Sequence, residues 1–92
     1  MKVHWTETAE RHLETIYAFI AQDSATYALR TVDQITRKSQ QIGEFPMSGR
    51  RVQEYDMDQI REVFVGSYRI IYHIKPGQID VLAVIHGTMD VL

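Results

Sequence analysis

Residues 61–85 read REVFVGSYRIIYHIKPGQIDVLAVI, and this stretch decides the fold. Three runs rich in β-branched and aromatic residues are separated by short turn signals, which is typical of consecutive β-strands. Gly66-Ser67 places glycine first in a two-residue loop, as a type II′ hairpin turn requires. Pro76-Gly77 fills the two central positions of a type II turn. The stretch therefore predicts a three-stranded antiparallel meander.

The two turns also set the register of the meander, because side chains on a strand alternate between its faces. One face is expected to be almost entirely apolar and to pack on helices. It holds Val63, Val65, Tyr68, Ile70, Tyr72, Ile74, Ile79, Val81, Ala83 and Ile85. Burial of large apolar side chains is worth about 1.5–3 kcal/mol each, so this face is expected to contribute the main stabilising free energy of the fold.

The opposite face of the predicted meander mixes charge with bulk. It holds Glu62, Phe64, Arg69, Ile71, His73, Asp80, Leu82, Val84 and His86. Its apolar members form a patch around Arg69 that no other segment is expected to cover, and an exposed patch of this kind indicates a partner. The alternative is that the N-terminal strand, the tail from residue 87 to 92 or a homodimer hides it.

The N-terminal half predicts one strand and two helices. Residues 1–5 alternate as a half-buried strand does, and Thr6 then has the position of a helix N-cap. Apolar residues at helical spacing predict helices over 6–22 and 24–42, with Gly43 as the C-cap of the second helix. The fold class is thus α+β, with an antiparallel helical hairpin on one sheet face. The neighbour of the first strand in the sheet stays open.

Composition limits the kinds of protein that the chain can be. Ninety-two residues with 45% apolar content predict a single domain over residues 1–92, and no stretch is apolar enough for a membrane span. Cysteine is absent and the four histidines lack metal-ligand spacing, so we expect no metal and no cofactor in a cytoplasmic protein. A formal charge of −2 counts against tight, sequence-independent binding of nucleic acid.

Several motifs resemble the RelE/ParE toxins of bacterial type II toxin-antitoxin operons. The order of strand, two helices and three strands is accompanied by Gly49-Arg50, Arg61-Glu62, Tyr68-Arg69-Ile70-Ile71-Tyr72 and Val84-Ile85-His86-Gly87. The resemblance implies a cognate antitoxin as partner, no membrane, and no direct DNA binding without the antitoxin. Within the superfamily the chain is most similar to ParE toxins, which implies inhibition of DNA gyrase. RelE toxins, by contrast, cut messenger RNA on the ribosome.

The resemblance also supplies candidate catalytic residues for the alternative function, a ribosome-dependent endoribonuclease. Such chemistry needs a base, an arginine and an acid that converge on a phosphate, and Glu54, Arg69 and His86 match relatives with that set. The register places Arg69 and His86 on one sheet face. Against this function, Thr88-Met89 replaces the basic pair of such relatives, and no tyrosine follows Tyr72. A gyrase inhibitor is therefore favoured; an inactive member that only binds its antitoxin is a third possibility.

Binding of antitoxin or target is predicted for one set of residues: Phe64, Arg69, Ile71, Leu82, Val84, Arg50, Arg51 and Arg61. Strand parity puts Arg61 on the core side unless a bulge intervenes. Simpler interpretations are a cross-strand pair of Arg69 with Glu62 and one of His73 with Asp80. Exposed positions are expected for His4 and His12, and hydroxyls at the rim of the core for Tyr68 and Tyr72.

Overall fold

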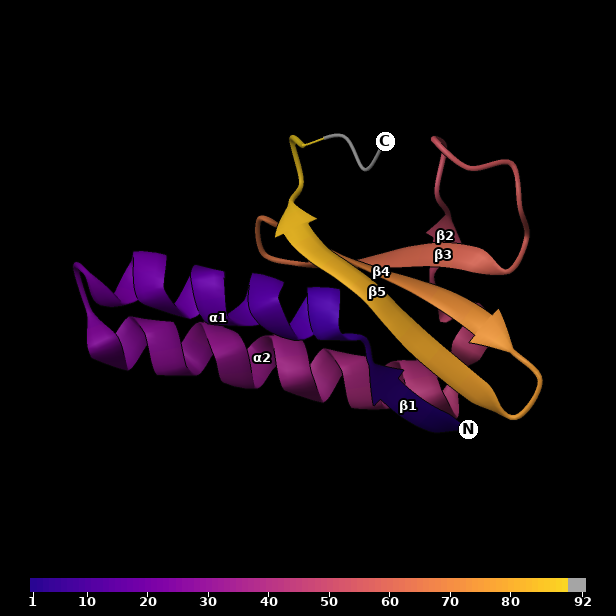
Figure 1. Cartoon of the computed structure of the whole chain (residues 1–92), viewed down its shortest axis with the longest axis horizontal. Helices are drawn as coiled ribbons and strands as arrows, with labels where there is room; N and C mark the ends of the chain where they lie inside the picture. The colour runs from indigo at the N-terminus through magenta and orange to yellow at the C-terminus, as the bar shows by residue number, and fades with distance from the viewer. Residues whose placement is uncertain (90–92) are drawn as a thin grey trace.

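The computed structural model describes residues 1–89 and contains two helices beside a five-stranded sheet (Figure 1). The elements in chain order are β1 (Lys2–Trp5), α1 (Glu7–Ala21), α2 (Ala25–Glu44), the 3-10 turn η1 (Pro46–Ser48), β2 (Arg50–Arg51), β3 (Ile60–Val65), β4 (Tyr68–Lys75) and β5 (Gln78–His86). Among the described residues no helix is long and apolar enough to cross a membrane.

The sheet has the strand order β1-β5-β4-β3-β2. β1 pairs with β5 in parallel, which answers the question of its neighbour, and the other pairs are antiparallel. The predicted meander is confirmed. Both of its turns use a glycine with positive φ, Gly66 at 56° and Gly77 at 74°, a conformation that costs glycine little.

The predicted helical hairpin is confirmed, and so is Thr6 as the N-cap of α1. Thr6 accepts a hydrogen bond from the backbone N–H of Ala9, and Ser24 accepts one from Tyr27. α2 continues past its predicted end at Ile42, so the assignment of Gly43 as a C-cap is wrong. Gly43 lies inside the helix. Glycine is needed there because a Cβ would be 2.7 Å from the carbonyl oxygen of Met1.

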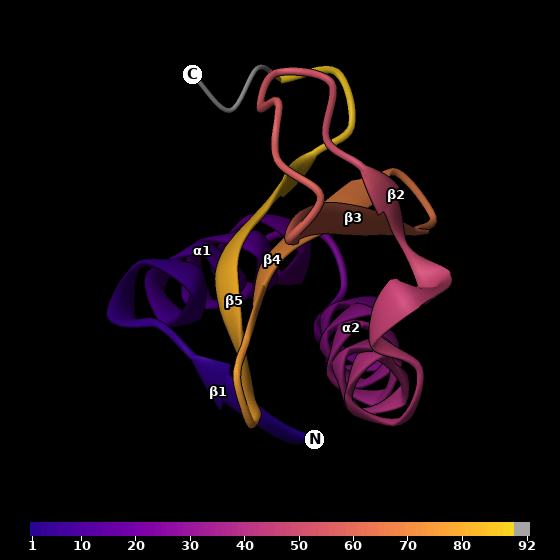
Figure 2. The same cartoon turned by 90° about the vertical axis from the view of Figure 1, so that its right-hand side faces the viewer.

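One main core joins both helices to the sheet. It includes Ala9, Ile16, Ile35, Ile42, Val63, Ile70, Tyr72, Ile79, Val81 and Val84. The sheet twists strongly, so that α2 lies beneath its concave side while α1 runs along the β5 edge (Figure 2). Leu29 of α2 is apolar but 60% exposed, because the buried stripe of α2 runs through Ala28, Thr31 and Ile35.

A β-bulge in β5 reverses the predicted faces of the strand's second half. Ile71 pairs with Ala83 and Tyr72 pairs with Val81, which leaves Leu82 as the extra residue. Side chains after a bulge change sides. Val84 is consequently buried in the main core, while Ala83 and Ile85 pack on the outer face. The predicted placement of these three residues is wrong for this reason.

Candidate functional site

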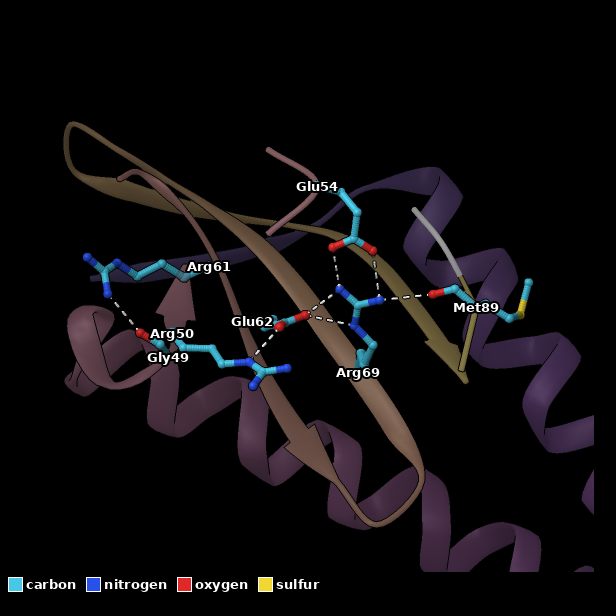
Figure 3. A network of polar contacts seen from close by, with 7 residues as sticks. All are labelled: Gly49, Arg50, Glu54, Arg61, Glu62, Arg69 and Met89. Carbon is cyan, nitrogen blue, oxygen red and sulfur yellow. Dashed lines mark hydrogen bonds and ion pairs between the residues drawn. The ribbon is translucent and has the colours of Figure 1, made fainter. Parts of the chain in front are cut away.

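Arg69 of β4 lies at the centre of a polar network on the outer sheet face (Figure 3). Its Nε donates to Oε1 of Glu62 at 2.7 Å, and its two terminal nitrogens each donate to a carboxylate oxygen of Glu54 at 3.2 Å. Nη1 also donates to the carbonyl oxygen of Met89 at 2.9 Å. One guanidinium therefore ties together β3, the loop before it and the segment after β5.

The strand register creates this arrangement. Arg69 is paired with Phe64 across β3 and β4, so Glu62 is its diagonal neighbour on the same face. The predicted pair of Arg69 with Glu62 is thus present, but it is buried instead of solvated: the side chains are 7% and 1% exposed. A second cation, Arg50, donates from Nε to the other oxygen of Glu62 at 2.7 Å. The two carboxylates and two guanidiniums balance in charge, as a buried network requires.

Arg69 remains charged in this setting. Burial by itself would lower the pKa of the guanidinium, but hydrogen bonds to Glu54 and Glu62, with the charges of both carboxylates, outweigh burial and raise the pKa. All three nitrogens of Arg69 are engaged with protein acceptors. Arg69 could bind a phosphate only by giving up at least one of these carboxylates.

The three candidate catalytic residues do not converge. Glu54 and Arg69 are in direct contact, whereas His86 lies on the helix side of β5, edge-on to the ring of Tyr68 with 5.9 Å between ring centroids. Its Nδ1 is 2.9 Å from the hydroxyl oxygen of Thr88. The bulge at Leu82 is the reason, since it turns His86 away from the face of Arg69. The prediction that Arg69 and His86 lie on one sheet face is therefore wrong.

The outer face is less open than the sequence predicted. Ile71 is buried in a second cluster with Val52 and Ile60, and Tyr55 and Leu82 pack against it. The loop before β3 therefore covers part of the patch, and the prediction that no segment remained to do so is wrong. The apolar residues of this loop were the available sequence signal. Phe64, 43% exposed, remains at the surface.

The three predicted basic residues have different surroundings. Arg61 lies on the core side, as predicted, and donates to the carbonyl oxygens of Gly49 at 2.9 Å and Asp58 at 3.0 Å. Arg51 forms ion pairs at the surface with Asp56 and Asp58. Arg50 lies over the ring of Phe64, with its guanidinium carbon 5.0 Å from the centroid, in a geometry that favours cation–π attraction. Only Arg50 therefore belongs to the network of Arg69.

Two residues have structural contacts that the sequence did not reveal. The hydroxyl of Tyr72 is buried, not at the rim: it donates to the carbonyl oxygen of Pro46 at 2.7 Å and accepts from the N–H of Gly49 at 3.0 Å. Burial raises the pKa of this phenol. His12, expected to be exposed, accepts at Nδ1 from the N–H of Val84 at 3.2 Å. His12 thus satisfies a donor just beyond the bulge.

The histidines near the start of β5 have no cluster of metal ligands around them. His4 is exposed and lies 3.3 Å from Asp80, whose second ion-pair partner is Lys75 at 2.6 Å. His73 is opposite Asp80 in the register, as predicted. Across residues 1–89 no group of three or more His, Cys, Asp or Glu side chains could hold a metal ion.

These features define the class of protein: a small α+β domain of two helices and a mixed five-stranded sheet, with a buried arginine–carboxylate network on its outer face. The family model for the ParE toxin of the type II toxin-antitoxin system, parDE, matches residues 3–91. The chain therefore belongs to the ParE toxin family.

Solved structures show the same fold. One is the chromosomal ParDE toxin-antitoxin system from P. aeruginosa, with a TM-score of 0.76 and 18% identity over 94% of this chain and 95% of that one. Another is a YoeB/ParE toxin from Agrobacterium tumefaciens, with a TM-score of 0.61 and 19% identity over 94% of this chain and 98% of that one. Comparison with curated protein sequences gives no match.

Proposed function

We propose that this protein inhibits DNA gyrase by direct contact in the cytoplasm and that a cognate antitoxin neutralises it. Membership of the ParE toxin family supports the assignment. The observation that carries it is the engagement of Arg69 with Glu54, Glu62 and Met89 while His86 lies on the opposite face. Inhibition by contact requires neither an arginine that is free to bind phosphate nor an acid and a base that converge, whereas RNA cleavage requires both.

A ribosome-dependent endoribonuclease is the second candidate, and one observation favours it. Glu54 and Arg69 line an open cleft of about 380 Å³, where a substrate could reach them. This function would require Arg69 to exchange a carboxylate for a phosphate and another group to replace His86 as the acid. Both requirements make it the weaker candidate, and an inactive member that only binds its antitoxin is the third.

Two assays on the purified toxin separate these functions. The first measures supercoiling of relaxed plasmid by gyrase, and the second measures messenger-RNA cleavage in a reconstituted translation reaction. We expect inhibition of supercoiling at a toxin concentration that leaves messenger RNA intact. Cleavage without inhibition of gyrase would replace the proposal with the endoribonuclease. Activity in neither assay, with antitoxin binding retained, would indicate an inactive member.

We propose that the antitoxin binds an apolar groove between α1 and β5, because Ile71 in the patch predicted around Arg69 is buried beneath the loop before β3. The groove has a volume of about 370 Å³ and is lined by His12, Thr15, Ile16, Phe19, Tyr68, Val84, Ile85, His86 and Met89. Phe19 is 68% exposed at its rim, and an exposed aromatic beside an apolar groove is a favourable anchor for a partner. The outer-face residues Phe64 and Leu82 then form a secondary contact at most.

Binding of the protein encoded beside the toxin gene tests this surface. Phe19→Asp should weaken that binding at least about tenfold, since it places a charge in the centre of an apolar contact. The matched control is Ala18→Asp, which adds the same charge at the adjacent exposed position of α1. Equal affinities for the two variants would remove the groove from the interface.

A further inference from the structure

Arg50 differs from the other arginines of the outer face in how it is held. Its side chain is 63% exposed, yet Nε is bound to the buried carboxylate of Glu62 and the guanidinium lies over Phe64. Within residues 1–89, neither terminal nitrogen of Arg50 makes a hydrogen bond, and both point away from Glu62 (Figure 3). The guanidinium is therefore fixed at one edge, while its two terminal nitrogens can donate into the cleft that Arg50 lines.

The backbone that carries Arg50 is also fixed. The preceding residue, Gly49, donates its N–H to the buried hydroxyl of Tyr72 and accepts from Arg61 at its carbonyl oxygen. A Cβ at position 49 would come within 2.6 Å of the carbonyl oxygen of Glu62, so the strand can approach β3 this closely only with glycine there. A side chain ordered before binding loses less conformational entropy when a partner binds.

The surroundings of Arg50 determine which ligand fits. Arg50, Arg69, Glu54 and Glu62 all line the cleft, so its formal charges cancel. The chain as a whole carries −2, and a polyanion such as RNA gains little from such a surface. A single carboxylate gains more, because a guanidinium can bind its two oxygens with two parallel hydrogen bonds.

Further apolar side chains are exposed in the segment that precedes β2. Phe45 and Met47 are exposed on and beside η1, which lies next to β2 (Figure 2). Phe64 adds an apolar surface directly beside the cation. Interface hot spots commonly combine an ordered arginine with aromatic neighbours.

We propose that Arg50, ordered by Glu62 and Phe64, is a docking site for a carboxylate side chain on an otherwise apolar peptide segment of a partner protein. The two outward terminal nitrogens of Arg50 select the carboxylate, and the exposed ring of Phe64 beside the guanidinium selects its apolar neighbours. The site lies apart from the groove between α1 and β5, and it does not depend on gyrase being the target.

The test follows the side-chain nitrogens of Arg50 by NMR at about physiological ionic strength. The probes are the peptides Ac-Leu-Glu-Leu-Glu-NH2 and Ac-Leu-Gln-Leu-Gln-NH2, inorganic phosphate and an RNA hexamer. We expect saturable shifts with the Glu peptide, at least about fivefold weaker binding of the Gln peptide, and weaker responses to phosphate and RNA. Saturation by RNA at lower concentration than the Glu peptide, or equal binding of both peptides, would overturn the proposal.

Two variants locate the effect. Arg50→Lys keeps the charge but loses the planar stack and the paired donors, so it should weaken binding of the Glu peptide at least about fivefold. The control, Arg37→Lys, alters an exposed ion pair with Asp33 on α2 and should leave the affinity unchanged. If both variants bind the peptide as the wild type does, or if no probe saturates in the millimolar range, Arg50 is not a carboxylate site. That conclusion about Arg50 would hold whether or not the toxin inhibits supercoiling by gyrase.

Discussion

Replacement of Arg69 by methionine tests whether the buried network holds the fold together. The substitution keeps most of the side-chain volume but leaves Glu62, 1% exposed, and Glu54 without their common cation. Removing one partner of a buried ion pair costs about 3–5 kcal/mol, and the lower end of this range applies here because Glu62 keeps Arg50 as a partner. In a domain of this size about 1 kcal/mol corresponds to roughly 4–8 °C in Tm. Arg69→Met should therefore lower Tm by at least about 12 °C.

Urea and thermal unfolding followed by circular dichroism at pH 7 measure this effect. The control is Arg37→Met, whose exposed pair with Asp33 is worth less than about 0.5 kcal/mol. A second variant, Arg69→Met with Glu54→Gln, should recover part of the loss, because one of the two carboxylates that shared Arg69 becomes neutral while Glu62 keeps its ion pair with Arg50. A free energy of unfolding for Arg69→Met within about 1 kcal/mol of the wild type would refute the reasoning.

Three further substitutions test the site and its supports. In His86→Gln, growth inhibition should remain intact and accompanied by DNA-damage signalling. Loss of growth inhibition, together with loss of ribosome-dependent cleavage, would favour the endoribonuclease. His12→Leu leaves the N–H of Val84 without its acceptor and should cost about 1–3 kcal/mol in urea unfolding, more than the exposed control His4→Leu. The hydrogen bond from Lys75, followed by that from Gln78, lowers the pKa of Asp80 to about 2. Because this pKa is depressed, the stabilisation is present above about pH 4 and is lost as pH falls towards 2. Tm should fall less between pH 5 and 2 in Asp80→Asn than in the wild type, and equal losses would exclude this contribution.

The parts of the fold that follow local rules could be predicted from the sequence. Thr6 and Ser24 cap their helices through their own hydroxyls, and Gly66 and Gly77 adopt the positive φ that their turns need. The pair of Arg69 with Glu62 follows from the register of a tight hairpin. Each of these features depends on residues within one turn or one hairpin, so no distant segment had to be placed first.

The burial of the site could not be predicted in the same way. Glu54 reaches Arg69 from a loop fifteen positions away in the chain, and Val52 covers Ile71 from that same loop. Both contacts depend on the position that an irregular segment takes in the fold, and sequence periodicity carries no information about that position. Burial raises the cost of removing one partner of the pair from near zero to several kcal/mol. The register alone could not show that the pair is buried.

The bulge at Leu82 was hidden for a different reason, and it decides the chemistry of the site. It lies within the apolar run Val81-Leu82-Ala83-Val84-Ile85, where either parity puts apolar residues on both faces. The backbone carbonyl oxygens of Val81 and Leu82 accept from the hydroxyl of Thr6 at 2.8 and 3.4 Å. His12 takes up the N–H of Val84. The N-cap of α1 and one side chain from its second turn thereby stabilise the irregular strand. Because one extra residue reverses every later side chain, these contacts also keep His86 on the face opposite Arg69.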